Sequence, residues 1–253
     1  RSLSGDSNVA VGSIAGDGAI GDNNIYVGHL AGQWSSNDRS IIMGPQSGMQ
    51  STNDRAVLIG NFANGNVTDP TRNVVAIGSS VQAKGKESIA VGFNARARGD
   101  NTLAIGRAAD AGILDGTVID AIALGTSAKS SGAGAVAIGK SATAMNASSV
   151  ALGENSVASV DLGQVGLNTK TGAASTDTTA TWKATKSAIS IGADTTAGGA
   201  FEQTRQITGL AAGTRAVDDF DWASACAVDR RLCPGLSARI QSDAQGIQPG
   251  GAA

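Results

Sequence analysis

The sequence has few of the residues from which a globular core is usually built. Aromatic residues make up 3% of its 253 residues and charged residues 16%, whereas about 25% charged is usual in soluble domains. It has one histidine, His29, and its only cysteines, Cys226 and Cys233, come late in the sequence. The core must therefore be thin and built mainly from Ala, Val, Ile and Leu.

These absences argue against several classes of function. One histidine, scattered carboxylates and no Cys/His spacing typical of zinc sites give little support to catalysis, so we expect no enzyme and no cofactor. A polysaccharide hydrolase stays open as an alternative, and it would need two carboxyl groups within about 10 Å on one face. The net charge of -2, without a basic block, gives no reason to expect nucleic-acid binding.

The sequence also lacks any apolar run approaching the ~18 residues of a membrane-spanning helix. The sequence opens at Arg1-Ser2-Leu3 without a charged segment followed by an apolar one, so any export signal is expected to lie outside it. The two cysteines are seven residues apart, and the sequence does not decide between a small disulfide loop and two unpaired thiols.

What the sequence does contain is a repeated signature of aliphatic, apolar, aliphatic and glycine residues. Val75-Ala76-Ile77-Gly78 is a clear copy, and successive signature glycines from Gly12 are 16, 16, 16, 18, 14, 14, 19, 14 and 14 residues apart. Such a period predicts an all-β fold, a parallel β-roll or solenoid of 14–16-residue coils. Glycines at these positions are predicted to lie in turns, the clearest being Gly78, Gly92, Gly106, Gly125, Gly139 and Gly153.

Each coil is predicted to have a second short strand, because small residues stand three and five positions after the signature glycine. The pairs are Val81 and Ala83, Ala95 and Ala97, Ala109 and Ala111, Ala128 and Ser130, and Ala142 and Ala144. In the first region, Asn37-Asp38 and Asn53-Asp54 are instead predicted to form turns. Extra residues around Asp69-Pro70 and at 113–117 predict surface bulges.

The signature strand predicts an oligomer. The residues flanking its centre point to one face and the middle residue to the other, and a solenoid standing alone should have polar middle residues. All ten are apolar: Ala10, Tyr26, Ile42, Leu58, Ala76, Ala90, Ala104, Ala123, Ala137 and Ala151. We therefore expect the flanking residues inside the roll and the middle residues against another copy of the chain. The residues assigned to core and trimer packing are Val75, Ala76, Ile77, Ile89, Ala90, Val91, Leu103, Ala104, Ile105, Val136, Ala137 and Ile138.

Four regions are predicted along the chain. Residues 1–78 form a head with 16-residue coils, and residues 79–164 a head with 14-residue coils. Residues 165–216 are an inserted segment that contains Trp182 and a last signature-like strand, Ser187-Ala188-Ile189-Ser190-Ile191-Gly192. Residues 217–253 have no repeat and no heptad and are predicted to be irregular, with a non-native end as an open alternative.

One copy of the repeat, Ser148-Ser149-Val150-Ala151-Leu152-Gly153-Glu154-Asn155-Ser156, matches Asn-Ser-Val-Ala-Ile-Gly-x-x-Ser nearly throughout. Residues 8–163 thereby resemble the YadA-like head of a trimeric autotransporter adhesin. The stretch containing Arg205, Ile207, Thr208, Leu210, Gly213 and Thr214 is similar to that family's neck. The family pattern does not continue beyond it, and Trp182 is similar to the family's tryptophan-ring element.

The resemblance implies a homotrimer of left-handed parallel β-rolls on the surface of a Gram-negative bacterium. It implies a virulence role through attachment to host extracellular matrix proteins or cell-surface receptors, with the outer-membrane anchor in another domain. Candidate ligand-binding residues on outer turns are Lys84, Lys86, Arg96, Arg98, Lys129 and Lys140, together with the bulge at 113–118. The alternatives are that these charges only keep the surface soluble, and that the chain is a structural spacer for a binding element elsewhere.

Overall fold

The computed structural model describes residues 3–68, 70–112, 117–168, 172–180, 182–193 and 203–208. The chain divides into two compact units, Arg1–Arg205 and Gln206–Ala253, and nearly all described residues belong to the first. Leu210, Gly213, Thr214, both cysteines and the predicted tail at 217–253 lie outside the described residues. So do Asp69 and residues 113–116 of the two predicted bulges.

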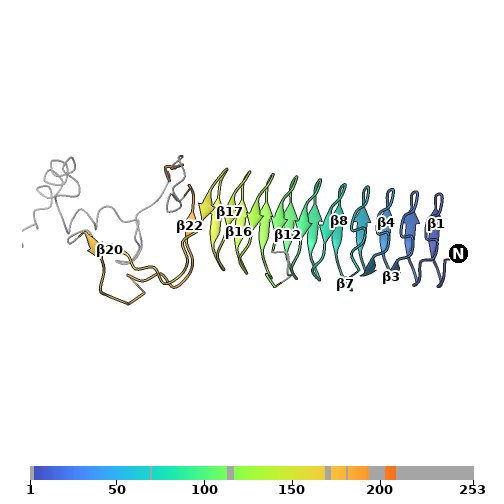
Figure 1. Cartoon of the computed structure of the whole chain (residues 1–253), viewed down its shortest axis with the longest axis horizontal. Coiled ribbons are helices and arrows are strands. Elements are labelled where there is room, and N and C mark those ends of the chain that lie inside the picture. Colours follow the sequence, from blue (N-terminus) through green and yellow to red (C-terminus); the bar gives the residue numbers. More distant parts are fainter. Residues whose placement is uncertain are drawn as a thin grey trace, which may run out of the picture. The chain divides into compact units, whose positions relative to one another are not determined.

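A long parallel sheet of eleven strands runs through the first unit, with one strand from each coil (Figure 1). Its order is β1 (Val9–Val11), β2 (Ile25–Val27), β4 (Ile41–Met43), β6 (Val57–Ile59), β8 (Val75–Ile77), β10 (Ile89–Val91), β12 (Leu103–Ile105), β14 (Ile122–Leu124), β16 (Val136–Ile138), β18 (Val150–Leu152) and β22 (Ile189–Ser190). Each signature pairs in register with the next, for example Val75 with Ile89 and Ile89 with Leu103. The predicted parallel solenoid is thus confirmed, while its left-handed sense stays a prediction.

The second strands of the coils form two further parallel sheets. The six-stranded sheet contains β19 (Val157–Ala158), β17 (Thr143–Ala144), β15 (Lys129–Ser130), β13 (Asp110–Ala111), β11 (Arg96–Ala97) and β9 (Gln82–Ala83). The three-stranded sheet contains β3 (Ser36–Asp38), β5 (Thr52–Asp54) and β7 (Thr71–Arg72). The predicted boundary at residue 78 lies where one of these sheets gives way to the other, although the eleven-stranded sheet continues across it.

The prediction of turns at Asn37-Asp38 and Asn53-Asp54 was wrong, because these residues lie in β3 and β5. The side chains of Asn37 and Asn53 are buried inside the roll. Asn53 donates its backbone N–H to Asn37 Oδ1 at 2.8 Å, and Asn64 donates its side-chain amide to Asn53 Oδ1 at 3.0 Å. Stacking of the coils supplies these partners, and it overrides the local preference of Asn and Asp for turns.

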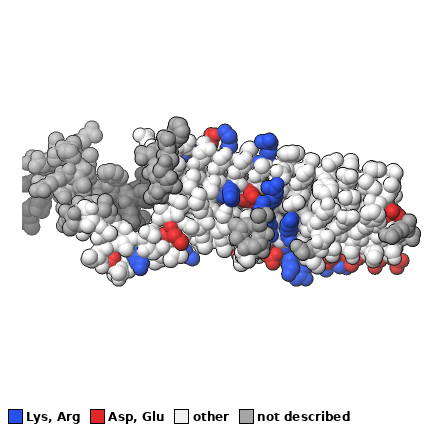
Figure 2. Space-filling model, in the orientation of Figure 1, with Lys and Arg blue, Asp and Glu red and all other residues white. Residues whose placement is uncertain are grey.

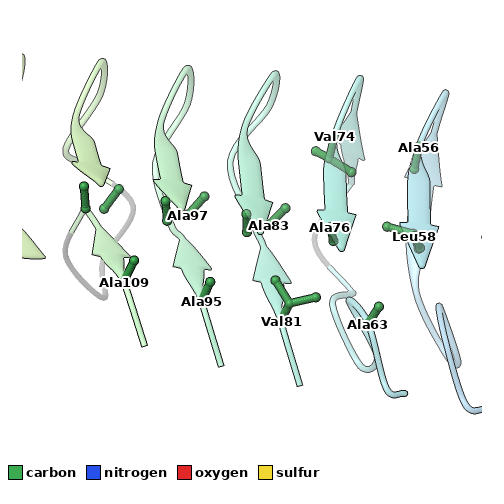
Figure 3. Close-up of a cluster of buried hydrophobic side chains, with 14 of the residues drawn as sticks. Ala56, Leu58, Ala63, Val74, Ala76, Val81, Ala83, Ala95, Ala97 and Ala109 are labelled. Carbon is green, nitrogen blue, oxygen red and sulfur yellow. The ribbon is translucent and has the colours of Figure 1, made fainter. Parts of the chain in front are cut away.

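The predicted orientation of the signature strands was also wrong. The middle residues, and not the flanking ones, form the core: Tyr26, Ile42, Leu58, Ala76 and the equivalent alanines of later coils are fully buried. Opposite them lie the small inward residues of the second strands, which are buried as predicted, and Figure 3 shows part of these rows. The two strands of a 14-residue coil are close together, so alanine fits between them and a Val or Ile pair does not.

The wider 16-residue coils accommodate larger middle residues because glycine stands against them. A Cβ atom on Gly32 would lie 2.1 Å from the Tyr26 ring, and one on Gly48 would lie 2.9 Å from Ile42. The Tyr26 hydroxyl is buried near Ser35 and Asn37 but makes a well-formed hydrogen bond with neither. The sizes of the residues that face each other across the core are therefore matched within each coil.

The signature glycines lie in turns where neighbouring coils nearly touch. Gly78, Gly92, Gly106, Gly125, Gly139 and Gly153 all have positive φ, between 107° and 138°. A Cβ atom on Gly92 would lie 2.5 Å from the carbonyl oxygen of Gly106 in the next coil. Only glycine combines this backbone conformation with so close an approach.

After β19 the chain leaves the stack and returns. The excursion contains an antiparallel pair, β20 (Leu167–Asn168) and β21 (Ala173–Ala174), and Trp182 accepts the Gly166 N–H through its carbonyl oxygen. β22 then pairs with β18, Val150 with Ile189 and Ala151 with Ser190, which confirms the last signature-like strand. Within the described ranges no helix is long and apolar enough to cross a membrane.

Candidate functional site

The outward side of the eleven-stranded sheet carries an apolar stripe. It consists of the two flanking residues of each signature strand from β1 to β18, and we call it the apolar ladder. Its members are Val9, Val11, Ile25, Val27, Ile41, Met43, Val57, Ile59, Val75, Ile77, Ile89, Val91, Leu103, Ile105, Ile122, Leu124, Val136, Ile138, Val150 and Leu152. Ten of them are exposed to between 36% and 57%, and the others are half-buried.

The register explains why these side chains stay partly exposed. Each flanking residue lies beside its equivalents in the preceding and following coils, as Ile89 lies between Val75 and Leu103. The neighbours cover the sides of each side chain, whereas its outward end has nothing of this chain above it. No polar residue interrupts the ladder, and soluble monomers rarely expose continuous apolar patches of such extent.

A second candidate surface lies on the outward side of the six-stranded sheet. Gln82, Arg96, Asp110 and Lys129 are paired in register on successive strands, while the alternate residues Ala83, Ala97, Ala111 and Ser130 point inward. The residue following β9 is Lys84, and the one following β11 is Arg98. The Lys84 N–H donates to Ala97 and the Arg98 N–H donates to Ala111, so these two positions also align. We call Lys84, Arg96, Arg98 and Lys129 the basic patch.

One carboxylate lies within the basic patch. Asp110 Oδ2 is 3.0 Å from the Arg98 guanidinium, and the two side chains are only 20% and 14% exposed. Burial raises the pKa of Asp110, and the charges of Arg98, Arg96 and Lys129 oppose that rise. Arg96 donates to Asn94 Oδ1 at 2.9 Å, and Lys84 and Lys129 have no ion pair among the described residues. Four cations and one carboxylate leave this face with an excess of positive charge (Figure 2).

Two predicted ligand residues lie outside the patch. Lys86 is at the bend after β9, where its N–H donates to Asp100 Oδ1 at 2.7 Å. Lys140 is in the turn before β17 and pairs with Glu154 at 2.8 Å, an exposed contact that raises the pKa of Lys140 and lowers that of Glu154. Of the bulge at 113–118, Thr117 is exposed and Val118 is buried. We did not predict from the sequence that Asp110 lies within the basic patch, although its place in the period-two pattern could have indicated that its side chain points outward.

Other carboxylates have structural roles. Asp22 accepts the backbone N–H of Asp6 at 2.8 Å, and Asp38 accepts that of Asp22 at 2.8 Å. Asp54 pairs with Arg39 at 3.1 Å and with Arg55 at 3.3 Å. The contacts of Asp22, Asp38 and Arg39–Asp54 join successive coils, whereas Arg55 and Asp54 are neighbours in sequence. Over the described part of the chain, no group of three or more His, Cys, Asp and Glu residues could hold a metal ion.

The neck-like arginine lies at the end of the stack. The Arg205 guanidinium donates to Ser156 Oγ at 3.0 Å and also to the carbonyl oxygens of Glu154 and Ile191. It covers Gly153, where a Cβ atom would lie 3.0 Å from the guanidinium carbon. Of the other residues predicted to form the neck, Ile207 and Thr208 are described and exposed, and their positions do not test that prediction.

Comparison with known proteins identifies the repeats. The model of the YadA head domain repeat matches twice, over residues 83–109 and 119–142. The first segment runs from the end of β9 past β12, the second runs from before β14 to the turn before β17, and together they include all six lysines and arginines predicted to bind ligand. No curated protein matches the chain. These two segments are therefore YadA-like head repeats, which supports the resemblance of the chain to the head of a YadA-like trimeric autotransporter adhesin, a family of adhesins and not of enzymes.

Proposed function

We propose that this chain assembles as a homotrimer and attaches a bacterial surface to host extracellular matrix proteins or cell-surface receptors. The binding is non-covalent and uses neither a cofactor nor catalysis. The observation that carries the proposal is the uninterrupted apolar ladder on a parallel sheet whose other face forms the core.

Parallel sheets are nearly always covered on both faces. In this chain the second strands cover only the inward face of the eleven-stranded sheet. The ladder repeats once per coil, at about 4.8 Å per strand, and another copy of the chain has the same spacing. A second and a third copy are therefore occupants that match the ladder along its whole length.

The similarity of the repeats to those of YadA-like heads, which are trimeric adhesins, supports three copies. With three ladders packed together, the six-stranded sheet of each chain faces outward. Any weak site on that face is then present three times, and multivalent contact with a surface raises the overall affinity without new contacts. A surface location on a Gram-negative bacterium belongs to the same proposal, with the membrane anchor supplied by another domain.

The assembly is tested by sedimentation equilibrium of the purified chain. We expect a particle of three times the 25.0 kDa mass of one chain. A well-folded monomer at micromolar concentration would overturn the proposed assembly.

Attachment is tested with beads coated with the trimer and presented to immobilised matrix proteins and cultured host cells. We expect retention of the coated beads above that of beads coated with an unrelated protein. A stable trimer that adheres to no matrix protein and no cell would favour the structural spacer instead.

A further inference from the structure

The charges of this head are unevenly distributed along the chain. Residues 3–68 contain five aspartates and two arginines, with no lysine and no glutamate. The four cations of the basic patch, by contrast, lie on or directly after three strands of one sheet, β9, β11 and β15, with Asp110 on β13 between β11 and β15. Farther along the same outward face, Thr143 and Val157 are uncharged. The positive charge is thus local and lies on a chain whose net charge is -2.

The parallel register arranges these cations along the axis of the coils. Neighbouring strands lie about 4.8 Å apart, so the strands from β9 to β15 span about 14 Å. Side chains two residues apart on one strand are separated by about 7 Å, as Arg96 and Arg98 are. A chain-like ligand lying along the axis would meet positive charge at β9, β11 and β15.

We propose that the basic patch binds a linear anionic polysaccharide through Lys84, Arg96, Arg98 and Lys129. This inference rests on the proposed attachment function and gives its ligand class. The bound groups are sulfates or carboxylates on successive sugars, which accept hydrogen bonds from the guanidinium and ammonium groups. Arg98 is only 14% exposed and is held against Asp110 at 3.0 Å, so it contributes its charge to the patch from a fixed position.

The distribution of charge favours a polysaccharide over a nucleic acid. Duplex DNA carries one charge per ~1.7 Å, and proteins that bind it tightly neutralise many phosphates. Here only four cations are available, Asp110 lies among them, and the aspartates of residues 3–68 would repel a long polyanion. A polymer with widely spaced anionic groups can satisfy the patch without placing further charges against the acidic part of the chain.

The patch and the apolar ladder do not compete for the same surface. Ala83 and Ala97 point from the six-stranded sheet into the core, and Ala76 and Ala90 point into the same core from the other sheet. Their outward faces are therefore on different sides of the coil. The basic patch stays accessible when the ladder is covered, and a trimer carries three patches.

The test measures binding of the full chain to immobilised glycans by surface plasmon resonance. Heparin and chondroitin sulfate represent host sulfated glycans, hyaluronan represents a host glycan with carboxylates only, and lipopolysaccharide represents a bacterial source. We expect at least one of these to bind with an affinity that falls as salt rises. The glycan that binds identifies the source and the anionic group. Absence of binding to all four at low salt would overturn the proposal, as would equal or tighter binding of duplex DNA.

A matched pair of double variants tests the location. Arg96→Gln with Lys129→Gln removes two charges from the patch, and we expect a loss of affinity of roughly tenfold or more. Lys86→Gln with Lys140→Gln removes the same net charge elsewhere, and we expect a change within about twofold. Circular dichroism and sedimentation verify that both variants keep the fold and assembly. Equal losses in the two variants would overturn the assignment.

Host cells separate this inference from the proposed function. If the patch variant and glycan-stripped cells both show reduced adhesion, the polysaccharide is the ligand. If the patch variant adheres as well as the wild type, and the wild type adheres equally well to glycan-stripped cells, the adhesin function stands and the polysaccharide inference fails.

Discussion

Leu152 and Met145 provide a sharp test of the apolar ladder. Each is 47% exposed in the single chain, and they are seven residues apart in sequence. Leu152 belongs to the ladder on β18, whereas Met145 follows β17 on the outward side of the six-stranded sheet. Leu152→Ser and Met145→Ser therefore remove similar exposed apolar surface from two different faces.

The magnitude follows from that exposure. Fully burying a leucine is worth about 1.5–3 kcal/mol, so covering the remaining half contributes about 0.7–1.4 kcal/mol per chain. Three copies make about 2–4 kcal/mol per trimer for Leu152→Ser, which is a decrease of roughly thirty- to a thousandfold in the association constant. Met145→Ser should leave this constant nearly unchanged, because Met145 meets no neighbouring chain in the proposed assembly.

Sedimentation velocity over a dilution series measures both variants. We expect the Leu152→Ser trimer to dissociate at a concentration at which the wild type and Met145→Ser remain assembled. Equal behaviour of the two variants would show that the ladder is not the contact surface, and the reasoning from sheet coverage would then be refuted.

Three further predictions concern the single chain. Burial raises the pKa of Tyr26, the only tyrosine, so its ultraviolet titration should begin above the ordinary value of 10.0. The stability that the protonated hydroxyl contributes is complete below about pH 10 and is lost as the pH rises further. Titration at the ordinary value in folded protein would contradict the buried position. In urea unfolding, Gly32→Ala should lower the free energy of unfolding by at least ~2 kcal/mol more than Gly134→Ala does. Both glycines have φ near 64°, but only Gly32 faces the Tyr26 ring. Equal losses in the two variants would count against this packing. Arg205→Ala should speed amide hydrogen exchange in β18 and β22 and leave exchange in β8 unchanged. Unchanged exchange in all three strands would mean that Arg205 does not stabilise the end of the stack.

Much of the fold could be predicted because the signature repeats at nearly constant spacing. Val-Ala-Ile-Gly and its variants specified one parallel strand and one tight turn per coil, and the alternating small residues specified a second strand. These are local signals, since a three-residue strand and a glycine with positive φ depend little on what lies far away in sequence. The family of the repeats could also be predicted from the same signature.

The orientation of those strands required the tertiary structure. Alternation shows that Ala76 and its neighbours Val75 and Ile77 face opposite ways, but it does not show which side is inside. The width of the coil decided that: the opposing row leaves room for alanine in the short coils, and glycine opposite Tyr26 makes room for a ring in a longer one. The side-chain oxygens of the buried Asn37 and Asn53 likewise accept hydrogen bonds from residues 16 and 11 positions away in sequence, and no local signal contains those partners.

The basic patch, too, could be predicted only in part from the sequence. The sequence identified its lysines and arginines individually, and Arg96, Asp110 and Lys129 each stand four residues after a signature glycine. The ion pair between Asp110 and Arg98, and the separation of Lys86 and Lys140 from the patch, were found only in the structure. Sequence thus determined the repeating unit and its chemistry, while contacts between coils decided which side chains are buried and which act together, because register and coil width are properties of the stack.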